Sequence, residues 1–193
     1  MANTKWIVDP AHSEFKFKVK HLMITNVTGY FRKFNIEVET EDEDFTKASK
    51  ILVTADIDSI DTNNEQRDTH LKSPDFFAAA EHEELRFEGK HFEKSGNEYK
   101  LTGNLTIRDV TKEVTVDVEY AGIVKDGYGQ TKAGFTVTGK INRKDFNLSW
   151  DSVTEAGQVV VSDDIRLLCE IQLIKQSGAR SENERAAAST TAL

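Results

Sequence analysis

Apolar and polar residues alternate with a period of two along most of the chain. The first clear example is residues 14–21, in which Phe15, Phe17, Val19 and His21 share one parity and four charged residues share the other. Such alternation is typical of a strand with one face in a core and the other in water. The same pattern recurs over residues 28–39, 51–57, 85–91, 99–107, 114–124, 133–141 and 165–173.

About eight long strands joined by short turns predict an all-β, antiparallel fold, either a closed barrel or a sandwich. The Ser-Gly-Asn triplet at 95–97 separates two of the strands and predicts a hairpin. Phe31 breaks the alternation of its segment, which indicates a bulge or a turn near Gly29. We place one domain at residues 1–175. The small, polar and aperiodic residues 176–193 then form a flexible tail or a vector-derived remnant.

Residues 59–80 contain the one helical interruption of this pattern. Asn63 or Asn64 can cap a short helix, which the Ser-Pro pair that follows it ends. Phe76 and Phe77 come next, although connections usually run over the surface and are polar. The segment is therefore either a lid packed over one end of a barrel or a helix that plugs the barrel as ordinary core.

The charge balance narrows the classes of partner. The chain has 33 acidic and 25 basic side chains, a formal net charge of −8. This charge argues against nucleic acid as a partner and weakens a role on anionic membrane surfaces.

No apolar run is long enough to span a bilayer, and the first ten residues lack the apolar stretch of a signal peptide. We therefore expect no transmembrane segment and a cytoplasmic location, or a periplasmic one if a leader was removed.

The sequence contains no recognisable catalytic or metal-binding motif. The five histidines lack the spacing of a metal site, and no phosphate-binding loop or nucleophile elbow occurs. Cys169 falls on the inward parity of the last strand, where burial would raise its pKa and make it inert. We therefore predict no enzyme activity, no cofactor and no metal.

Small residues alternate with bulky ones on the inner face of the predicted strands. Glycine inside a strand allows curvature or the close approach of another group. These positions therefore either leave an apolar cavity for one small ligand or serve curvature alone, with side chains filling the interior. The glycines are Gly89, Gly103 and Gly139, and the large side chains on their parity are Phe87, Leu101, Phe135 and Val137.

Two residues near this face have two interpretations each. His21 is either a hydrogen-bonded core residue or a ligand contact. Arg143 could meet a polar head group at the mouth of the barrel, where a charge stays partly hydrated. It could equally pair with Asp145 or Asp109 and fasten a corner of the fold.

Several motifs resemble the YceI-like proteins. The opening segment 6–34, WIVDPAHSEFKFKVKHLMITNVTGYFRKF, contains the family's Trp-x-x-Asp-x-x-His-Ser pattern, followed by His-Leu-Met and Gly-x-Phe. Further matches occur at 59–77, 101–118 and 133–150. The resemblance therefore covers nearly all of residues 6–175.

The resemblance implies a lipocalin-like, eight-stranded antiparallel barrel with a short helical lid and a long apolar cavity. It also implies binding of a polyisoprenoid chain or a similar amphiphilic lipid, such as a polyprenyl phosphate or a quinone-type tail. Asp109 and Asn147 stand where the family commonly has glycine, and we expect the same turns because both residue types tolerate positive φ. Arg67 and Asp68 on the short helix are expected to form a polar network that seats the lid.

The predicted ligand contacts come from this resemblance and from the parity pattern. His21, Met23, Phe31, Phe76 and Trp150 match family positions near the cavity or its mouth. The other predicted contacts are Phe15, Phe17, Val19, Phe87, Leu101, Gly103, Phe135, Val137, Arg143 and Phe146.

The leading hypothesis is a non-enzymatic carrier or store for an isoprenoid lipid, held in the barrel with its head group at the mouth. One rival is an enzyme that acts on a lipid inside the barrel, with His21 as general base. Another is a stress-related binding or assembly factor that acts through its surface. A homodimer is compatible with each of these hypotheses.

Overall fold

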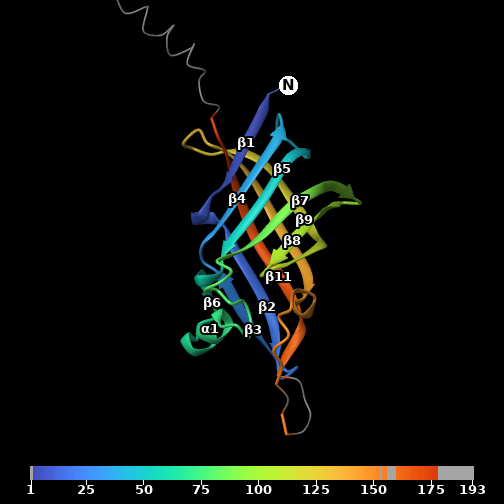
Figure 1. Cartoon of the computed structure of the whole chain (residues 1–193). Helices are drawn as coiled ribbons and strands as arrows, with labels where there is room; N and C mark the ends of the chain where they lie inside the picture. The colour runs from blue at the N-terminus through green and yellow to red at the C-terminus, as the bar shows by residue number, and fades with distance from the viewer. Residues whose placement is uncertain (1, 153, 156–159, 178–193) are drawn as a thin grey trace, which may run out of the picture.

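The computed structural model describes residues 2–152, 154–155 and 160–177 and shows a closed antiparallel β-barrel with one short α-helix (Figure 1). Within these residues, eight strands form the ring in the order β1-β4-β5-β7-β8-β9-β10-β11, and pairing of β11 with β1 closes it. Beyond β11 the sheet continues through β2, β3 and β6. The predicted barrel is therefore confirmed.

The strands are β1 (Asn3–Val8), β2 (Glu14–His21), β3 (Thr25–Phe31), β4 (Phe34–Glu41), β5 (Asp44–Asp56), β6 (Ile60–Asp61), β7 (Glu84–Ser95), β8 (Glu98–Ile107), β9 (Val110–Lys125), β10 (Thr131–Asn142) and β11 (Val161–Lys175). The helices are α1 (Glu65–Lys72) and the short 3₁₀-helices η1 (Pro10–His12), η2 (Ile57–Ser59) and η3 (Arg143–Phe146). From residue 178 onward, the predicted tail at 176–193 lies outside the described residues.

Most strands lie where the alternation predicts them, and the turn at 95–97 joins β7 to β8 as expected. The alternation does not predict β1, because its inward positions include Thr4 and the apolar pattern is too short to detect. Asn147 has the expected positive φ of 60°, whereas in the turn between β8 and β9 the left-handed residue is Arg108 and not Asp109.

The break predicted near Gly29 is present as a turn a few residues later, and no bulge occurs at Gly29 itself. The segment 28–39 divides instead at Arg32 and Lys33, between β3 and β4, and Gly29 lies within β3 opposite Phe17. A Cβ atom on Gly29 would lie only 2.2 Å from the Phe17 ring. The glycine therefore lets an aromatic ring of the neighbouring strand lie against the backbone, and it does not mark a change of direction.

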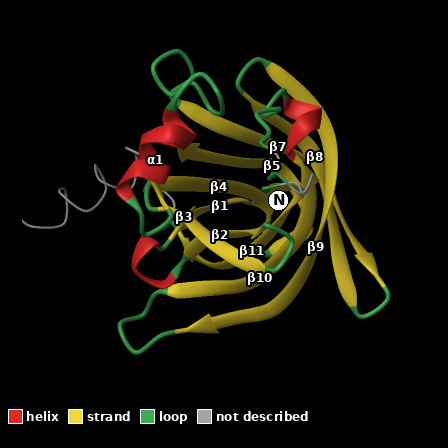
Figure 2. Cartoon of the chain, turned by 90° about the horizontal axis from the view of Figure 1, so that it is seen from below, coloured by secondary structure: helices red, strands yellow, loops and turns green. Residues whose placement is uncertain are grey.

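One side of the barrel is divided between two strands. In the orientation of Figure 1, β1 pairs with the upper end of β11 and with β4, whereas β2 pairs with the lower part of β11 and with β3. The helix η1 lies at the break between them. Below the break, β3, β6 and α1 complete the wall, and α1 lies beside the lower opening (Figure 2).

The upper half of the barrel is packed with side chains. Trp6 is fully buried, and its indole N–H donates to Thr40 Oγ1 at 3.1 Å. Phe45 meets Trp6 at a ring separation of 4.9 Å and meets Phe135 edge to face at the same separation. Aliphatic residues of β1, β4 and β11 complete this apolar cluster.

The predicted helix is α1, and it covers the barrel as a lid rather than plugging it. Asn64 caps the helix by accepting a hydrogen bond from the Arg67 backbone N–H at 2.9 Å, and Ser73 ends it. No residue of α1 is buried, whereas Phe76 and Ala78 in the segment that follows are. Among the described residues, no helix is long and apolar enough to cross a membrane.

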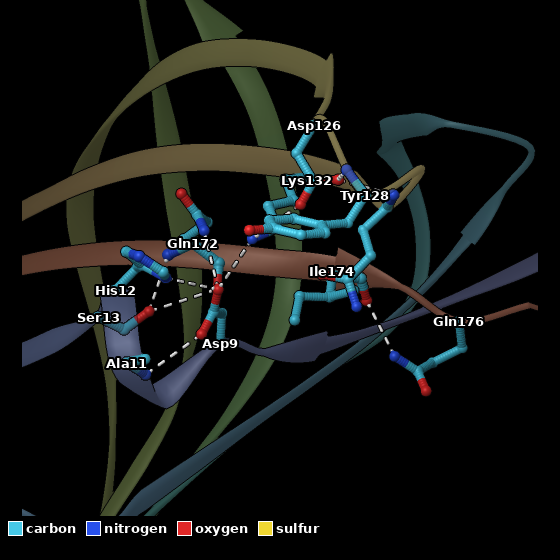
Figure 3. Close-up of polar contacts among 11 residues, drawn as sticks. Asp9, Ala11, His12, Ser13, Asp126, Tyr128, Lys132, Gln172, Ile174 and Gln176 are labelled. Atoms are coloured by element: carbon cyan, nitrogen blue, oxygen red, sulfur yellow. Dashed lines mark hydrogen bonds and ion pairs between the residues drawn. The ribbon is translucent and has the colours of Figure 1, made fainter.

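A buried carboxylate fastens the break between β1 and β2. Asp9 is 6 % exposed and accepts a hydrogen bond from the Ala11 backbone N–H at 3.2 Å. His12 Nδ1 and Gln172 Nε2 each lie 2.9 Å from its other oxygen, and Lys132 Nζ lies 3.4 Å from it (Figure 3). Since Lys132 belongs to β10 and Gln172 to β11, this side chain joins the break to two strands of the ring.

The surroundings of Asp9 act on its pKa in opposite directions. Burial raises the pKa, but hydrogen bonds from His12, Gln172 and Lys132 outweigh burial and hold the pKa below the ordinary value of 3.8. The charged form is therefore favoured in the folded protein. The corresponding stabilisation is present above the unfolded-state pKa and is lost as the pH falls through the folded-state pKa.

We predict that Asp9→Asn lowers the free energy of unfolding at pH 7 by about 2 kcal/mol, because it removes charge-assisted hydrogen bonds from a buried site. Urea denaturation between pH 7 and pH 2 measures the effect, and the difference from wild type should shrink as the pH falls. The control Glu93→Gln changes an exposed carboxylate of β7 and should not move the urea midpoint. A difference that stays constant over this pH range would contradict the account.

Candidate ligand-binding site

An apolar cavity of about 310 Å³ lies in the lower half of the barrel. Strands β2 and β11 form one wall, and residues of β3, β7, β8 and β10 form the rest. Residues of the lid helix α1 and of the segments 76–77 and 148–150 also line the cavity. The apolar lining consists of Phe15, Phe17, Val19, Val27, Phe31, Leu71, Phe76, Phe77, Leu85, Leu105, Ile107, Ile141, Leu148, Trp150, Val160, Val161, Ile165 and Leu167.

The period-two pattern of β2 produces the cavity wall directly. Phe15, Phe17 and Val19 all line the cavity, and they are only half-buried because they face it. The ring of Phe31 on β3 lies 5.2 Å from that of Phe15 and 5.6 Å from that of Phe17. From the lid side, Phe77 meets Phe31 edge to face at 6.1 Å. Wall and lid therefore share one aromatic cluster.

Ring contacts hold the lid against the segment 148–150. His70 of α1 meets Phe76 edge to face at 5.1 Å and Trp150 at 4.9 Å. The rings of Phe76 and Trp150 are 5.4 Å apart. Arg108, in the turn between β8 and β9, donates from Nη1 to the Phe76 carbonyl at 3.2 Å. Three separate segments therefore meet around the cavity.

The predicted polar network between Arg67 and Asp68 is present at the start of the lid. Thr62 donates from its backbone N–H (2.9 Å) and its hydroxyl (2.5 Å) to Asp68 Oδ1. Arg67 Nε donates to Thr62 Oγ1 at 2.8 Å, and Arg67 Nη2 donates to the Thr62 carbonyl at 2.7 Å. Within the described part of the chain, Arg67 Nη1 has no hydrogen-bond acceptor.

Arg143 fastens a corner of the fold and also lines the cavity. It is 3 % exposed, and its Nη1 donates to the carbonyls of Leu148 (2.6 Å) and Trp150 (2.8 Å). Its Nε donates to the Ser162 carbonyl at 3.0 Å. One buried guanidinium therefore ties the segment 148–150 to the beginning of β11, which is the structural one of its two predicted roles.

The ion-pair partners of Arg143 differ from those that the sequence suggests. Asp151 and Asp163 lie 3.5 Å and 3.6 Å from its Nη2. The sequence pointed to Asp145 or Asp109, which are close in the chain or in a neighbouring turn. The two aspartates that approach instead each follow a residue whose backbone carbonyl accepts a hydrogen bond from Arg143. Asp151 follows Trp150, and Asp163 follows Ser162.

The polar groups of the cavity are cationic, titratable or hydroxylic. They are Lys20, His21, Thr62, Arg67, His70 and Arg143, and none of the lining residues among those described is an Asp or a Glu. His21 is exposed, and its ring has no hydrogen-bond partner among the described residues, so it is not a hydrogen-bonded core histidine. An apolar chamber with positive charge at its edge suits an amphiphile with an anionic or hydrogen-bond-accepting head.

The free thiol of the chain lies outside the cavity lining, and the described residues contain no cluster suited to a metal ion. Cys169 packs in the upper cluster, and burial raises its pKa to about 11, so almost no thiolate is present at neutral pH. The described residues hold no group of three or more His, Cys, Asp or Glu side chains arranged to bind a metal ion.

Eight of the fifteen predicted ligand contacts line this cavity, and ligand contact at all fifteen positions stays a prediction. The eight are Phe15, Phe17, Val19, His21, Phe31, Phe76, Arg143 and Trp150. Met23 is 54 % exposed in the turn between β2 and β3. The remaining six pack in the core and do not line the cavity, and they are Phe87, Leu101, Gly103, Phe135, Val137 and Phe146.

The inner glycines explain why the cavity does not extend through the barrel. A Cβ atom on Gly103 would lie 2.5 Å from the Phe87 ring, and one on Gly139 would lie 2.6 Å from Val116 Cγ1. Neighbouring side chains therefore occupy the space that these glycines leave. At these positions glycine serves close packing rather than a ligand.

Some cavity residues were missed by the sequence analysis for a physical reason. Leu85, Leu105 and Ile107 share their parity with predicted residues, but parity shows the face of a strand and not the depth along the barrel. Arg67 and His70 lie on a helix whose polar sequence gives no sign that it borders an apolar chamber.

Comparison with known proteins places this barrel in a family. The YceI-like domain family matches residues 6–173. The chain belongs to the YceI-like family. A UPF0312 protein of Staphylococcus aureus is 40 % identical to it over 166 residues, covering 84 % of this chain and 93 % of that protein. A UPF0312 protein of Staphylococcus epidermidis is 37 % identical with the same coverage.

Solved structures share the YceI-like barrel. The crystal structure of the Campylobacter jejuni YceI protein is 35 % identical, with a TM-score of 0.69, and covers 82 % of this chain and 90 % of its own. A polyisoprenoid-binding domain from Saccharophagus degradans has a TM-score of 0.62 at 12 % identity and covers 89 % of this chain and 98 % of its own. At that identity the second comparison shows a common fold alone.

We predict that Arg143→Met lowers the free energy of unfolding by about 3 kcal/mol. The backbone carbonyls that accept hydrogen bonds from the guanidinium, and the two carboxylates that pair with it, would lose their partner. Urea denaturation measures the change. Arg166→Met on β11 is the matched control, since Arg166 is exposed and within the described residues has no ion pair, and it should change stability by less than about 0.5 kcal/mol. Equal effects of the two substitutions would contradict a fastening role.

Proposed function

We propose that this YceI-like protein binds an isoprenoid amphiphile in the lower cavity and carries or stores it without chemical change. The observation that carries the proposal is a chamber lined by apolar and aromatic side chains, closed by an aromatic lid, whose polar groups include no carboxylate. The likeness of the barrel to the polyisoprenoid-binding domain of Saccharophagus degradans supports it.

The size of the cavity limits the part of a ligand that it can hold. Its volume of about 310 Å³ is at the lower end of the ~300–1,000 Å³ found for small-molecule sites. A short prenyl chain, or the end of a longer one, therefore fits the chamber better than a whole long polyprenyl chain. Burial of apolar area at about 25 cal/mol per Å² supplies the affinity, and association costs reduce it.

The head group is proposed to lie near Arg67 and Lys20. Arg67 is held by two bonds to Thr62, which leaves Nη1 without an acceptor among the described residues. A donor that is already oriented loses little entropy when it binds a phosphate or a carbonyl oxygen. This arrangement favours a prenyl phosphate over a neutral quinone head.

The rival hypothesis of an enzyme with His21 as general base receives less support from the geometry. A catalytic histidine is usually oriented by a partner on its second nitrogen, and the His21 ring has none among the described residues. A role through the surface, a homodimer and the cytoplasmic or periplasmic location all stay predictions from the sequence.

We predict that Val19→Trp weakens binding of geranylgeraniol at least about tenfold, because the indole would fill part of a chamber to which each buried CH₂ contributes about 0.8 kcal/mol. Titration calorimetry and native mass spectrometry measure the loss. Val124→Trp places the same side chain on an exposed position of β9 and should bind as wild type does. Unchanged binding by a folded Val19→Trp protein would overturn the assignment of the cavity.

We predict that Arg67→Gln weakens binding of geranylgeranyl phosphate about tenfold, because a hydrogen bond to a charged group contributes about 1.5 kcal/mol. Binding of geranylgeraniol, which has a neutral head, should change much less. The same two titrations on Lys125→Gln, which removes an exposed charge of β9 where that strand pairs with Thr131 and away from the lining residues, provide the control. Equal losses for the phosphate and the alcohol would show that Arg67 only supports the lid.

A further inference from the structure

The turn between β2 and β3 exposes two large apolar side chains. Met23 is 54 % exposed and Ile24 is 79 % exposed. Leu22 and Met23 also have left-handed backbones, with φ of 51° and 58°, where Asn and Gly are the usual residues. The hairpin tip, residues 22–24, therefore breaks two local rules, and such exceptions concentrate at functional sites.

A row of unpaired cations runs from this tip along the outer face of the barrel. Lys16, Lys18 and Lys20 occupy the parity of β2 opposite to that of Phe15, Phe17 and Val19, and Lys20 at the lower end also borders the cavity. On β11, Arg166 lies directly opposite Lys18. None of these four side chains lies within 4 Å of a carboxylate in the described chain. Like charges opposite each other destabilise a sheet, so this basic strip is a local cost to folding.

The carboxylates nearest the basic strip do not neutralise it. Asp163 and Asp164, at the start of β11, lie 3.2 Å and 3.5 Å from lysines that are not part of the strip. Asp151 likewise binds one of these lysines at 2.9 Å. Further up the barrel, the strip ends at Glu14 and Glu170, which face each other across β2 and β11. The positive region is thus confined to the lower end.

The cavity opens beside the hairpin tip. Lys20 and His21, which come just before the tip, both line the cavity and are exposed. The backbone N–H of Leu22 donates to the Val160 carbonyl at 2.8 Å, and Val160 also lines the cavity. In Figure 1 the turn between β2 and β3 lies at the lowest part of the barrel, next to the beginning of β11. Mouth, tip and basic strip therefore share one end.

We propose that this end docks on an anionic lipid bilayer, with Met23 and Ile24 inserted among the lipids and the basic strip on the charged surface. Apolar side chains flanked by lysines and arginines are the combination that anionic bilayers attract. Two protruding side chains are too small an apolar area for a stable protein interface, which buries about 800 Å² on each partner. The net charge of −8 hides this local positive region.

The docking has a direct consequence for the ligand. A mouth held at the membrane surface would let an isoprenoid pass between bilayer and cavity without crossing water. This exchange rests on the proposed function, whereas the membrane contact depends only on the tip and the strip. The two ideas can therefore fail separately.

The test is flotation of the full chain with vesicles of equal parts phosphatidylglycerol and phosphatidylcholine, compared with vesicles of phosphatidylcholine alone. Wild type should float with the anionic vesicles, more weakly at high salt, and should not float with the neutral ones. Met23→Ser combined with Ile24→Ser should weaken the vesicle affinity at least about tenfold. Val124→Ser combined with Tyr128→Ser removes two exposed apolar residues at the opposite end and should have no effect.

The basic strip is tested separately. Lys18→Gln combined with Arg166→Gln should weaken the affinity for anionic vesicles about fivefold per cation removed. Lys94→Gln combined with Lys125→Gln removes the same charge from exposed positions outside the strip and should leave most of the affinity. Urea midpoints of all variants should stay near that of wild type or above it, because the altered side chains are exposed, apart from the half-buried Lys18.

Three results would overturn the docking proposal. The first is that wild type does not float with anionic vesicles, and the second is that the tip and control variants float equally. The third is that the tip variants abolish a concentration-dependent dimer, which would assign the tip to a second copy of the chain. Geranylgeraniol binding in the absence of vesicles is measured on the same variants. Retained binding without flotation would remove only the docking proposal, and flotation without binding would remove only the proposed function.

Discussion

The architecture depends on how the break between β1 and β2 is held. β11 is a single long strand, but two different strands cover its far edge, one at each end of the barrel. Asp9 anchors the point of exchange by binding groups of η1, β10 and β11. β1 continues to β4, whereas β2 continues to β3, so the wall divides at the break. Residues of β2 and β3 line the cavity, and among the described residues none of β1 or β4 does.

The interior of the barrel also differs above and below the break. The cluster above the break is built around large rings, contains the fully buried Trp6 and extends down to the inert Cys169, which pairs with Phe15 of β2. Below the break, β2 presents Phe15 and Phe17 to a cavity that the lid segments border. The packed upper cluster therefore contributes most to stability, whereas the lower half keeps unfilled apolar space beside the lid.

Period-two alternation was sufficient to predict the barrel and the cavity face of β2, because the alternation of side chains across a strand is fixed by backbone geometry. It did not separate Phe17, which lines the cavity, from Phe135, which is packed in the upper cluster. That distinction depends on depth along the barrel, which arises from register and strand tilt. Gly103 was predicted as a ligand contact because a missing Cβ does not reveal whether a ring or a ligand occupies the space, and the Phe87 ring lies there. The helical lid was predictable from its caps, but the orientation of Arg67 was not.

The two tryptophans of the chain stand in the two halves of the barrel. Trp6 is fully buried beside Thr40 and Phe45, while Trp150 lies between His70 and Phe76 on the cavity border. Their indole emission therefore reports on different events. Trp6 senses loss of the global fold, whereas Trp150 senses the polarity and quenching around the lid. Replacing either one by Phe would leave a protein with a single tryptophan, so that opening of the lid and unfolding of the barrel become optically separable without any attached dye.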